Sequence, residues 1–351
     1  MIKTFTVHAG THKTASTYIQ SRLWRNREIL ENYGIKLLYP KQEKTGQYED
    51  FATRLYNENY TKIENELVSL KEEYDHLLVS AEQFTKSIIS KKHLDGFQAL
   101  LAKLGYKLNV VIFLRDQPDY INSIYVQEVR RFYHSLSVPK FEIKCRKQRP
   151  HRFNYEEMFS DLLDDNRINV KFLPYCSSFG DPFGRLIDSL EQDLPRDIEW
   201  IPANPGKSND QPGVKGVWLA LKACKRMQKL GVKLQRLENQ SNYIRKYSIP
   251  RRWSEDRFYG LRPKKVKIIR EYYKSGNDRF ARRVWDNKTW EEVYKNLPIQ
   301  KYNVMDEELL SKEEMNEMNE LLEQILSDLK QGNPSAFSKA RKRRRQYDPR
   351  K

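Results

Sequence analysis

The feature that most constrains the fold is a strand, loop and helix at residues 2–24. Residues 2–10 alternate apolar and polar side chains as a strand does. Small, hydroxyl-bearing and basic residues follow, including Lys13, and the loop opens into a helix whose first turn carries Ser16 and Thr17. Unpaired N–H groups at a helix start, the helix dipole and a lysine ammonium all attract anions. The segment therefore predicts a phosphate-binding loop.

This loop differs from the nucleoside-triphosphatase pattern G-x-x-x-x-G-K-[ST], because position 15 is Ala and Lys13 lies three residues before Ser16. It resembles the 5′-phosphosulfate loop, K-[ST]-G-[ST]-T, of sulfotransferases that use 3′-phosphoadenosine 5′-phosphosulfate (PAPS). The resemblance implies that PAPS is bound by Gly10, Thr11, His12, Lys13, Thr14, Ala15, Ser16 and Thr17. Ala15 replaces the family's glycine, and we expect this to be tolerated only at a negative φ. The alternative is an ordinary strand-to-helix turn capped by Ser or Thr.

A second segment supports the phosphate site. Residues 108–114 form a continuous apolar run, typical of a buried parallel strand, and Arg115 follows directly before a helix at 119–125. Ligands of such sheets bind beyond the carboxyl ends of the strands. Ser123 completes the spacing R-x7-S, which resembles the sulfotransferase 3′-phosphate motif. The resemblance implies that Arg115 and Ser123 bind the 3′-phosphate of PAPS.

A third predicted strand, residues 74–80, delivers Glu82 to the same edge of the sheet. In sulfotransferases a residue after this strand removes the acceptor proton, so we expect Glu82 to be the base if burial raises its pKa. Glu49 and His12 are rival bases, and Glu49 is also expected near the acceptor. The alternative for Glu82 is a solvated or helix-capping carboxylate.

The resemblance is closest to bacterial glycan-type sulfotransferases, with the patterns G-x-H-K-T-G-T-T-x-[IL]-Q, S-x-E and L-R-x-Q-x-x-Y. The chain matches them at Gly10, His12, Lys13, Thr14, Thr17, Ile19, Gln20, Ser80, Glu82, Leu114, Arg115, Gln117 and Tyr120. Residues 272–283 resemble a later segment, S-N-x-x-[LV]-A-R-R, with Gly276 inserted. This implies that Asn277 and Arg279 also contact the cofactor.

Charge indicates the kind of partner. The net charge is +17, which favours polyanions such as PAPS or an acidic glycan. Within residues 242–253, aromatic rings that stack on sugars alternate with arginines that pair with carboxylates or sulfates, so Tyr243, Arg251 and Trp253 are candidate substrate contacts. The basic tail is expected to be disordered and able to touch anionic phospholipid, and no specific nucleic-acid module is found.

These observations predict an α/β fold with a parallel sheet flanked by helices and a helical C-terminal subdomain. We expect a PAPS-binding core at 1–205, a mostly helical part at 206–335 that completes the cofactor and acceptor sites, and a tail at 336–351. The chain enters a strand within five residues and has no apolar run of 18 residues, which favours a cytoplasmic location. Three scattered cysteines predict neither a disulfide framework nor a metal site.

The function expected from the resemblance is sulfonate transfer from PAPS to a hydroxyl or amine of a carbohydrate-like acceptor, with Lys13 and Glu82 as catalytic residues. Two alternatives belong to other classes: an ATP-dependent small-molecule kinase and a non-catalytic nucleic-acid-binding protein. A kinase is disfavoured because the apolar run ends in Arg115 instead of a magnesium-binding Asp.

Overall fold

The computed structural model describes residues 3–40, 45–148, 152–190, 192–204, 211–234 and 237–338. Its packing divides the chain into two compact units, each assembled from three segments. Unit 1 comprises Met1–Gln117, Pro150–Asn209 and Arg270–Pro298, and unit 2 comprises Pro118–Arg149, Asp210–Ile269 and Ile299–Lys351. The units are thus interleaved along the sequence, whereas the predicted division follows the chain linearly. The tail from residue 339 lies outside the described residues.

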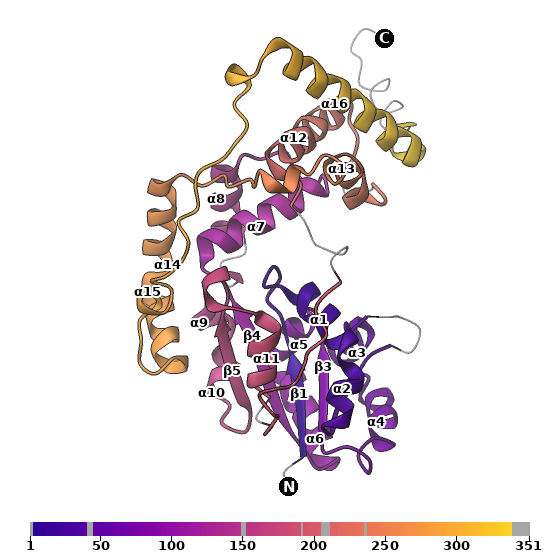
Figure 1. Cartoon of the computed structure of the whole chain (residues 1–351), viewed down its shortest axis with the longest axis vertical. Helices are drawn as coiled ribbons and strands as arrows, with labels where there is room; N and C mark the ends of the chain where they lie inside the picture. Colours follow the sequence, from indigo (N-terminus) through magenta and orange to yellow (C-terminus); the bar gives the residue numbers. More distant parts are fainter. Residues whose placement is uncertain are drawn as a thin grey trace. The chain divides into compact units, whose positions relative to one another are not determined.

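The centre of unit 1 is a five-stranded parallel sheet (Figure 1). Its strands are β1 (Lys3–His8), β2 (Ile35–Leu38), β3 (His76–Ser80), β4 (Tyr106–Leu114) and β5 (Asn169–Pro174), in the order β2-β3-β1-β4-β5. Val7 is in register with Val79 on β3 and with Val110 on β4. Parallel pairing brings the carboxyl ends of neighbouring strands to one edge. The predicted α/β fold with a parallel sheet is confirmed.

Helices cover both faces of this sheet, and apolar side chains of β2, β3 and β4 are buried on both of them. One face packs against α1 (Ser16–Arg25), α2 (Arg27–Asn32) and α11 (Pro182–Asp188). The other packs against α3 (Glu49–Tyr56), α4 (Tyr60–Val68), α5 (Phe84–Ile88), α6 (Lys91–Lys103), α9 (Tyr155–Met158), α10 (Ser160–Asp164), α15 (Trp290–Val293) and the end of α14 (Pro263–Val284). A 3₁₀ turn, η2 (Ser177–Phe179), precedes α11.

The helices that follow β1 and the helices that follow its neighbour β3 lie on opposite faces of the sheet. The helices that follow β1, α1 and α2, lie on one face, whereas α5 and α6, which follow β3, lie on the other. Such a reversal opens a crevice at the carboxyl ends of the strands, where ligands of open α/β sheets bind. The topology therefore places the loop after β1 where ligands of such sheets bind.

Unit 2 is helical over its described residues, apart from one bridge between Tyr259 and Asn303. It contains α7 (Gln117–Arg130, from its second residue), α8 (Val138–Gln148), α12 (Gly213–Lys229), α13 (Gln240–Ser248), η4 (Trp253–Glu255), the start of α14, η5 (Glu307–Leu309) and α16 (Lys312–Gly332). Helices α12, α13 and α16 pack together around buried Met227, Ile244 and Ile325. Over the described ranges of both units, none of the helices is long and apolar enough to cross a membrane.

Candidate functional site

The loop between β1 and α1 holds two side-chain-bearing residues in the left-handed region. Lys13 has a φ of 72° and Ala15 a φ of 63°. The expectation that Ala15 adopts a negative φ is therefore wrong. For an L-residue this conformation costs roughly 1–2 kcal/mol, so the surrounding contacts must enforce it, and such strain concentrates at functional sites. Left-handed residues within a loop help to turn successive N–H groups toward one concave side, as in anion-binding nests.

The N-terminus of α1 has no side-chain cap. The N-cap residue is Ala15, Ser16 is the first helical residue, and no side chain accepts a capping hydrogen bond there. The alternative of an ordinary Ser- or Thr-capped turn is therefore wrong. The Ser16 hydroxyl is buried beside Glu82, and its interaction with that carboxylate lowers the pKa of Glu82. A helix of ten residues thus offers its first N–H groups and a buried hydroxyl at this point.

Threonine hydroxyls fix the shape of the loop. Thr11 donates to the Phe113 carbonyl of β4 at 2.8 Å, and Thr14 donates to the Thr11 carbonyl at 2.5 Å. From α5, Thr85 donates to the Gly10 carbonyl at 2.7 Å. Both loop threonines are buried, so they position the backbone and their hydroxyl protons are already engaged.

Gly10 is required by a close approach. A Cβ atom there would lie 2.6 Å from the Ser16 hydroxyl oxygen, well inside normal contact. The glycine thereby allows the loop to fold back against the first turn of α1. Thr17, the next residue of that turn, is exposed.

His12 and Glu82 form a hydrogen-bonded pair at the carboxyl ends of β1 and β3. The His12 Nδ1 atom lies 2.7 Å from Glu82 Oε2, and the histidine side chain is 43% exposed. Burial alone would raise the pKa of Glu82. The hydrogen bond and charge of His12, the Ser16 hydroxyl and the charge of Lys13 outweigh it and hold that pKa below its ordinary value. The condition attached to Glu82 as the base, a raised pKa, is therefore not met.

A second histidine lies directly below the loop. His8, the last residue of β1, is fully buried, and its Nδ1 lies 2.7 Å from the Ser80 hydroxyl. Burial lowers its pKa to about 4, although the Glu82 carboxylate acts in the opposite direction. His8 is therefore neutral at pH 7 and supports the loop as a polar core residue.

Arg115 leaves the end of β4 beside the loop. Its guanidinium donates to the Lys13 carbonyl at 3.3 Å and lies 5.8 Å from the Tyr175 ring centroid. The Arg115 carbonyl accepts from the Tyr155 hydroxyl at 2.7 Å. The backbone of Arg115 is thus fixed while its cationic head reaches the strained loop. The predicted neighbours Lys13 and Arg115 do meet within unit 1.

The segment after Arg115 is clamped by α14 and α15. Asp116 is buried and accepts from the Arg270 guanidinium at 2.8 and 2.9 Å and from the Trp290 indole at 3.0 Å. Gln117 and Asn277 exchange two amide hydrogen bonds of 2.6 and 2.9 Å. Asn277, predicted to contact the cofactor, is thus engaged in a buried amide pair.

Two other predicted residues of unit 1 lie at the surface. Arg279 forms a bidentate pair with Glu156 at 2.6 and 2.7 Å. Glu49 is exposed at the first position of α3, and Tyr48 before it donates its N–H to the Ser80 carbonyl at 2.9 Å. This bond places Glu49 near the end of β3, and within the described part of the chain Glu49 forms no hydrogen bond or ion pair with His12 or Glu82.

The remaining predicted site residues belong to unit 2. Ser123 is buried in α7. Tyr243 on α13 accepts a hydrogen bond from the Asn333 amide at 3.1 Å. The Arg251 guanidinium lies 5.8 Å from the Trp253 ring centroid, so these two candidate substrate residues stack on each other. Their roles stay predictions.

Some residues that fix the site come from elsewhere in the chain and could not be identified from the sequence. Thr85 and Asp116 make the anchoring contacts described above. Nothing in the sequence distinguishes Thr85 from any other helical threonine. Asp116 gives a faint signal, since a carboxylate two residues after a buried strand is expected to be buried and then requires a partner. That partner, Arg270, lies 154 residues away and could not be named beforehand.

Comparison of the chain with protein-family models, with curated proteins and with solved structures finds no match in any of the three. Functional inference therefore depends on the site's own residues.

Proposed function

We propose that this chain is a PAPS-dependent sulfotransferase acting on a hydroxyl or amine of a carbohydrate-like acceptor. The observation that carries the proposal is the loop at residues 10–15. It places Lys13 and Ala15 in strained left-handed conformations immediately before an uncapped helix N-terminus. An anionic ligand bound by the N–H groups of α1 would account for both the strained loop and the uncapped helix end beside it.

The residues present fit the 5′-phosphosulfate group. The uncapped N–H groups of α1 and the buried Ser16 hydroxyl are neutral donors, and Lys13 supplies positive charge. Bound PAPS would supply a sulfonate on a phosphate oxygen, and breaking that S–O bond leaves 3′-phosphoadenosine 5′-phosphate (PAP). The Lys13 ammonium stabilises the charge that accumulates on the leaving oxygen. Arg115, fixed at the end of β4, binds the 3′-phosphate.

His12 is the better candidate for the base, with Glu82 as its positioning residue. An ionised carboxylate only accepts hydrogen bonds, so the Nδ1 atom of His12 must carry the proton that faces Glu82. In the neutral ring this leaves Nε2 with a free lone pair, on a half-exposed side chain. Nε2 takes the acceptor's proton as the acceptor oxygen or nitrogen bonds to sulfur, and Glu82 stabilises the resulting imidazolium. Glu82 acting alone is the alternative.

The acceptor class rests on residues of unit 2. Tyr243, Arg251 and Trp253 combine rings with a guanidinium, a set that suits sugars carrying acidic groups. Ser123 is assigned by spacing to the 3′-phosphate. These four assignments are part of the proposal.

The cofactor assignment is tested by calorimetry on Arg115→Ala. We expect PAP binding to weaken by about 2–3 kcal/mol, the scale for losing a charged hydrogen bond, while AMP, which lacks the 3′-phosphate, should weaken much less, since only the hydrogen bond from Arg115 to the Lys13 carbonyl is lost from its loop. Arg283→Ala, which removes an exposed guanidinium paired with Asp164 on the same unit, is the matched control. Equal losses for PAP and AMP would refute the assignment.

The catalytic roles are tested by the rate of PAP release from PAPS, with water or a supplied sugar as acceptor. His12→Gln should lower kcat by about 10²–10⁴, and Lys13→Ala by about 10²–10³, with smaller changes in PAP affinity. If His12→Gln is mild while Glu82→Gln is severe, Glu82 is the base. If both are mild, neither residue is.

A further inference from the structure

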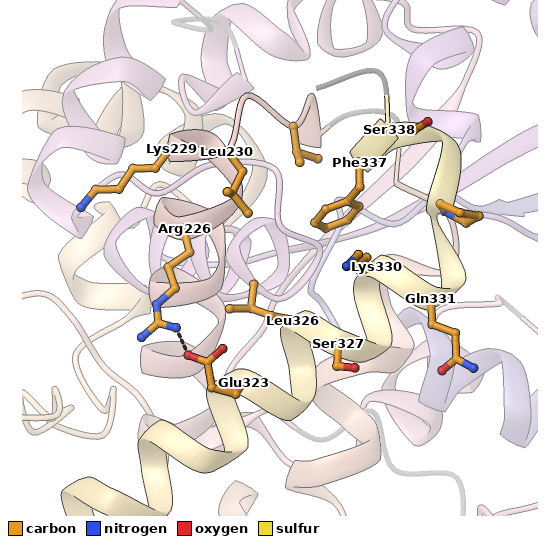
Figure 2. A pocket seen from close by; sticks show the side chains of 12 residues that line it. Arg226, Lys229, Leu230, Glu323, Leu326, Ser327, Lys330, Gln331, Phe337 and Ser338 are labelled. Atoms are coloured by element: carbon orange, nitrogen blue, oxygen red, sulfur yellow. Dashed lines mark hydrogen bonds and ion pairs between the residues drawn. The ribbon is translucent and has the colours of Figure 1, made fainter. Parts of the chain in front are cut away.

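An open hollow of about 1210 Å³ lies between the C-terminal parts of α12 and α16 in unit 2. Figure 2 shows Leu230, Leu326 and Phe337 turned toward this space. Its apolar lining is Leu230, Val232, Leu326, Pro334 and Phe337. Leu230 is 42% exposed, so part of this lining contacts solvent. We call this the apolar hollow.

Cationic side chains stand at the margin of the apolar hollow. Arg226 is paired with Glu323 across the two helices, as the dashed line in Figure 2 shows. Lys229 and Lys330 also line the hollow, and neither has an ion pair with any acidic residue in the described ranges. With one carboxylate against three cations, the margin carries a positive surplus.

A second hollow of about 610 Å³ shares Arg226 and Lys229 with the first. It is lined along α12 by Lys222, Lys225, Arg226 and Lys229, which recur at helical spacing and so share one face. Lys222 is paired with Glu307 at 2.7 Å. We call this the basic hollow. The apolar hollow and the basic hollow therefore share two lining residues.

We propose that unit 2 binds a single-chain anionic amphiphile, with its alkyl chain in the apolar hollow and its phosphate or sulfate head on Lys225, Arg226 and Lys229. The charge and polarity of these two neighbouring hollows match the two ends of such a molecule. The apolar hollow exceeds the usual range for small-ligand sites, roughly 300–1,000 Å³, so a long chain has room. This site is independent of the proposed sulfotransferase function.

The other occupants that could fill the apolar hollow fit less well. Residues 339–351 follow Ser338 directly in sequence, but they carry eight positive and one negative residue. Their charge has the same sign as the margin, so charge complementarity does not select them. A plain inorganic anion would make no use of the apolar lining.

The probe is dodecyl phosphate below its micelle concentration, titrated calorimetrically into the full chain. We expect one saturable site, with affinity rising about fourfold per methylene from octyl to dodecyl phosphate, the factor for burying a CH₂ group. Inorganic phosphate should neither bind nor compete at equal concentration. Affinity that is independent of chain length, or binding only to anionic vesicles with none of the monomer, would overturn the proposal.

Two variants separate the two ends of the ligand. Lys225→Glu with Lys229→Glu should weaken dodecyl phosphate at least tenfold, and Leu230→Ser with Phe337→Ser should do the same. The matched control is Lys312→Glu with Lys301→Glu, since neither lysine lines either hollow. Lys312 lies 18 residues before Lys330 on α16, about 27 Å along the axis. If the control weakens binding equally, the attraction is general charge. If the serine variant binds normally, the apolar hollow does not hold the chain.

Discussion

Replacing Ala15 with glycine should stabilise unit 1, although glycine usually destabilises. Ala15 has a φ of 63° and forms the N-cap of α1. Relief of the left-handed conformation is worth roughly 1–2 kcal/mol. Glycine's extra freedom in the unfolded chain costs about 0.5–1 kcal/mol. The difference is a net stabilisation of about 0–1.5 kcal/mol for Ala15→Gly, centred at about 0.75 kcal/mol.

The assay is urea unfolding followed by pulsed hydrogen exchange at β1 and β4, which reports unit 1 by itself. The matched control is Ala99→Gly, an exposed position within α6, where the same substitution should cost about 1 kcal/mol. The two variants should thus shift the unfolding midpoint in opposite directions. If Ala15→Gly destabilises unit 1 as much as Ala99→Gly does, the loop is not held in a strained conformation, and strain no longer indicates a ligand-binding role for it.

Two further predictions concern the supports of the site. His8 has a pKa of about 4 when folded and about 6.5 when unfolded, so the unfolded chain binds the proton first as the pH falls. Stability should therefore be complete above pH 6.5 and decline toward pH 4, by up to about 3 kcal/mol. His8→Asn should flatten this decline in unit 1, whereas His134→Asn, a buried histidine of unit 2 whose pKa is also about 4, should leave the unit 1 profile unchanged. Asp116→Asn should lower the stability of unit 1 by about 1–2 kcal/mol, because the half-exposed Arg270 guanidinium loses the buried carboxylate charge with which it pairs. Glu156→Gln, which breaks a more exposed pair, should change it by less than about 1 kcal/mol; equal effects would show that Asp116 is no special anchor.

The sheet and the position of the loop could be predicted because their signals are local. The apolar run at 108–114 requires burial on both faces, and it lies within β4. The loop after the first strand leads directly into α1, and Arg115 follows β4 as the sequence indicates. These elements need no knowledge of distant contacts.

The chemistry of the site could be predicted only in part because it depends on pairing across the sheet. His12 and Glu82 are 70 residues apart, and they meet because β1 and β3 pair with His8 opposite Ser80. Only that pairing reveals that the charge of His12 offsets the burial of Glu82. Likewise, alanine's own preference favours negative φ, so the left-handed Ala15 reflects the tertiary contacts of the loop.

Calorimetric titration of the unmodified chain with PAP, ADP and ATP tests the central claim most directly. All three nucleotides offer a 5′-phosphate to the loop, but only PAP has the 3′-phosphate assigned to Arg115. A sulfotransferase should bind PAP at least tenfold more tightly than ADP, with or without magnesium. Tighter binding of ATP than of PAP, dependent on magnesium, would contradict the account and favour a kinase.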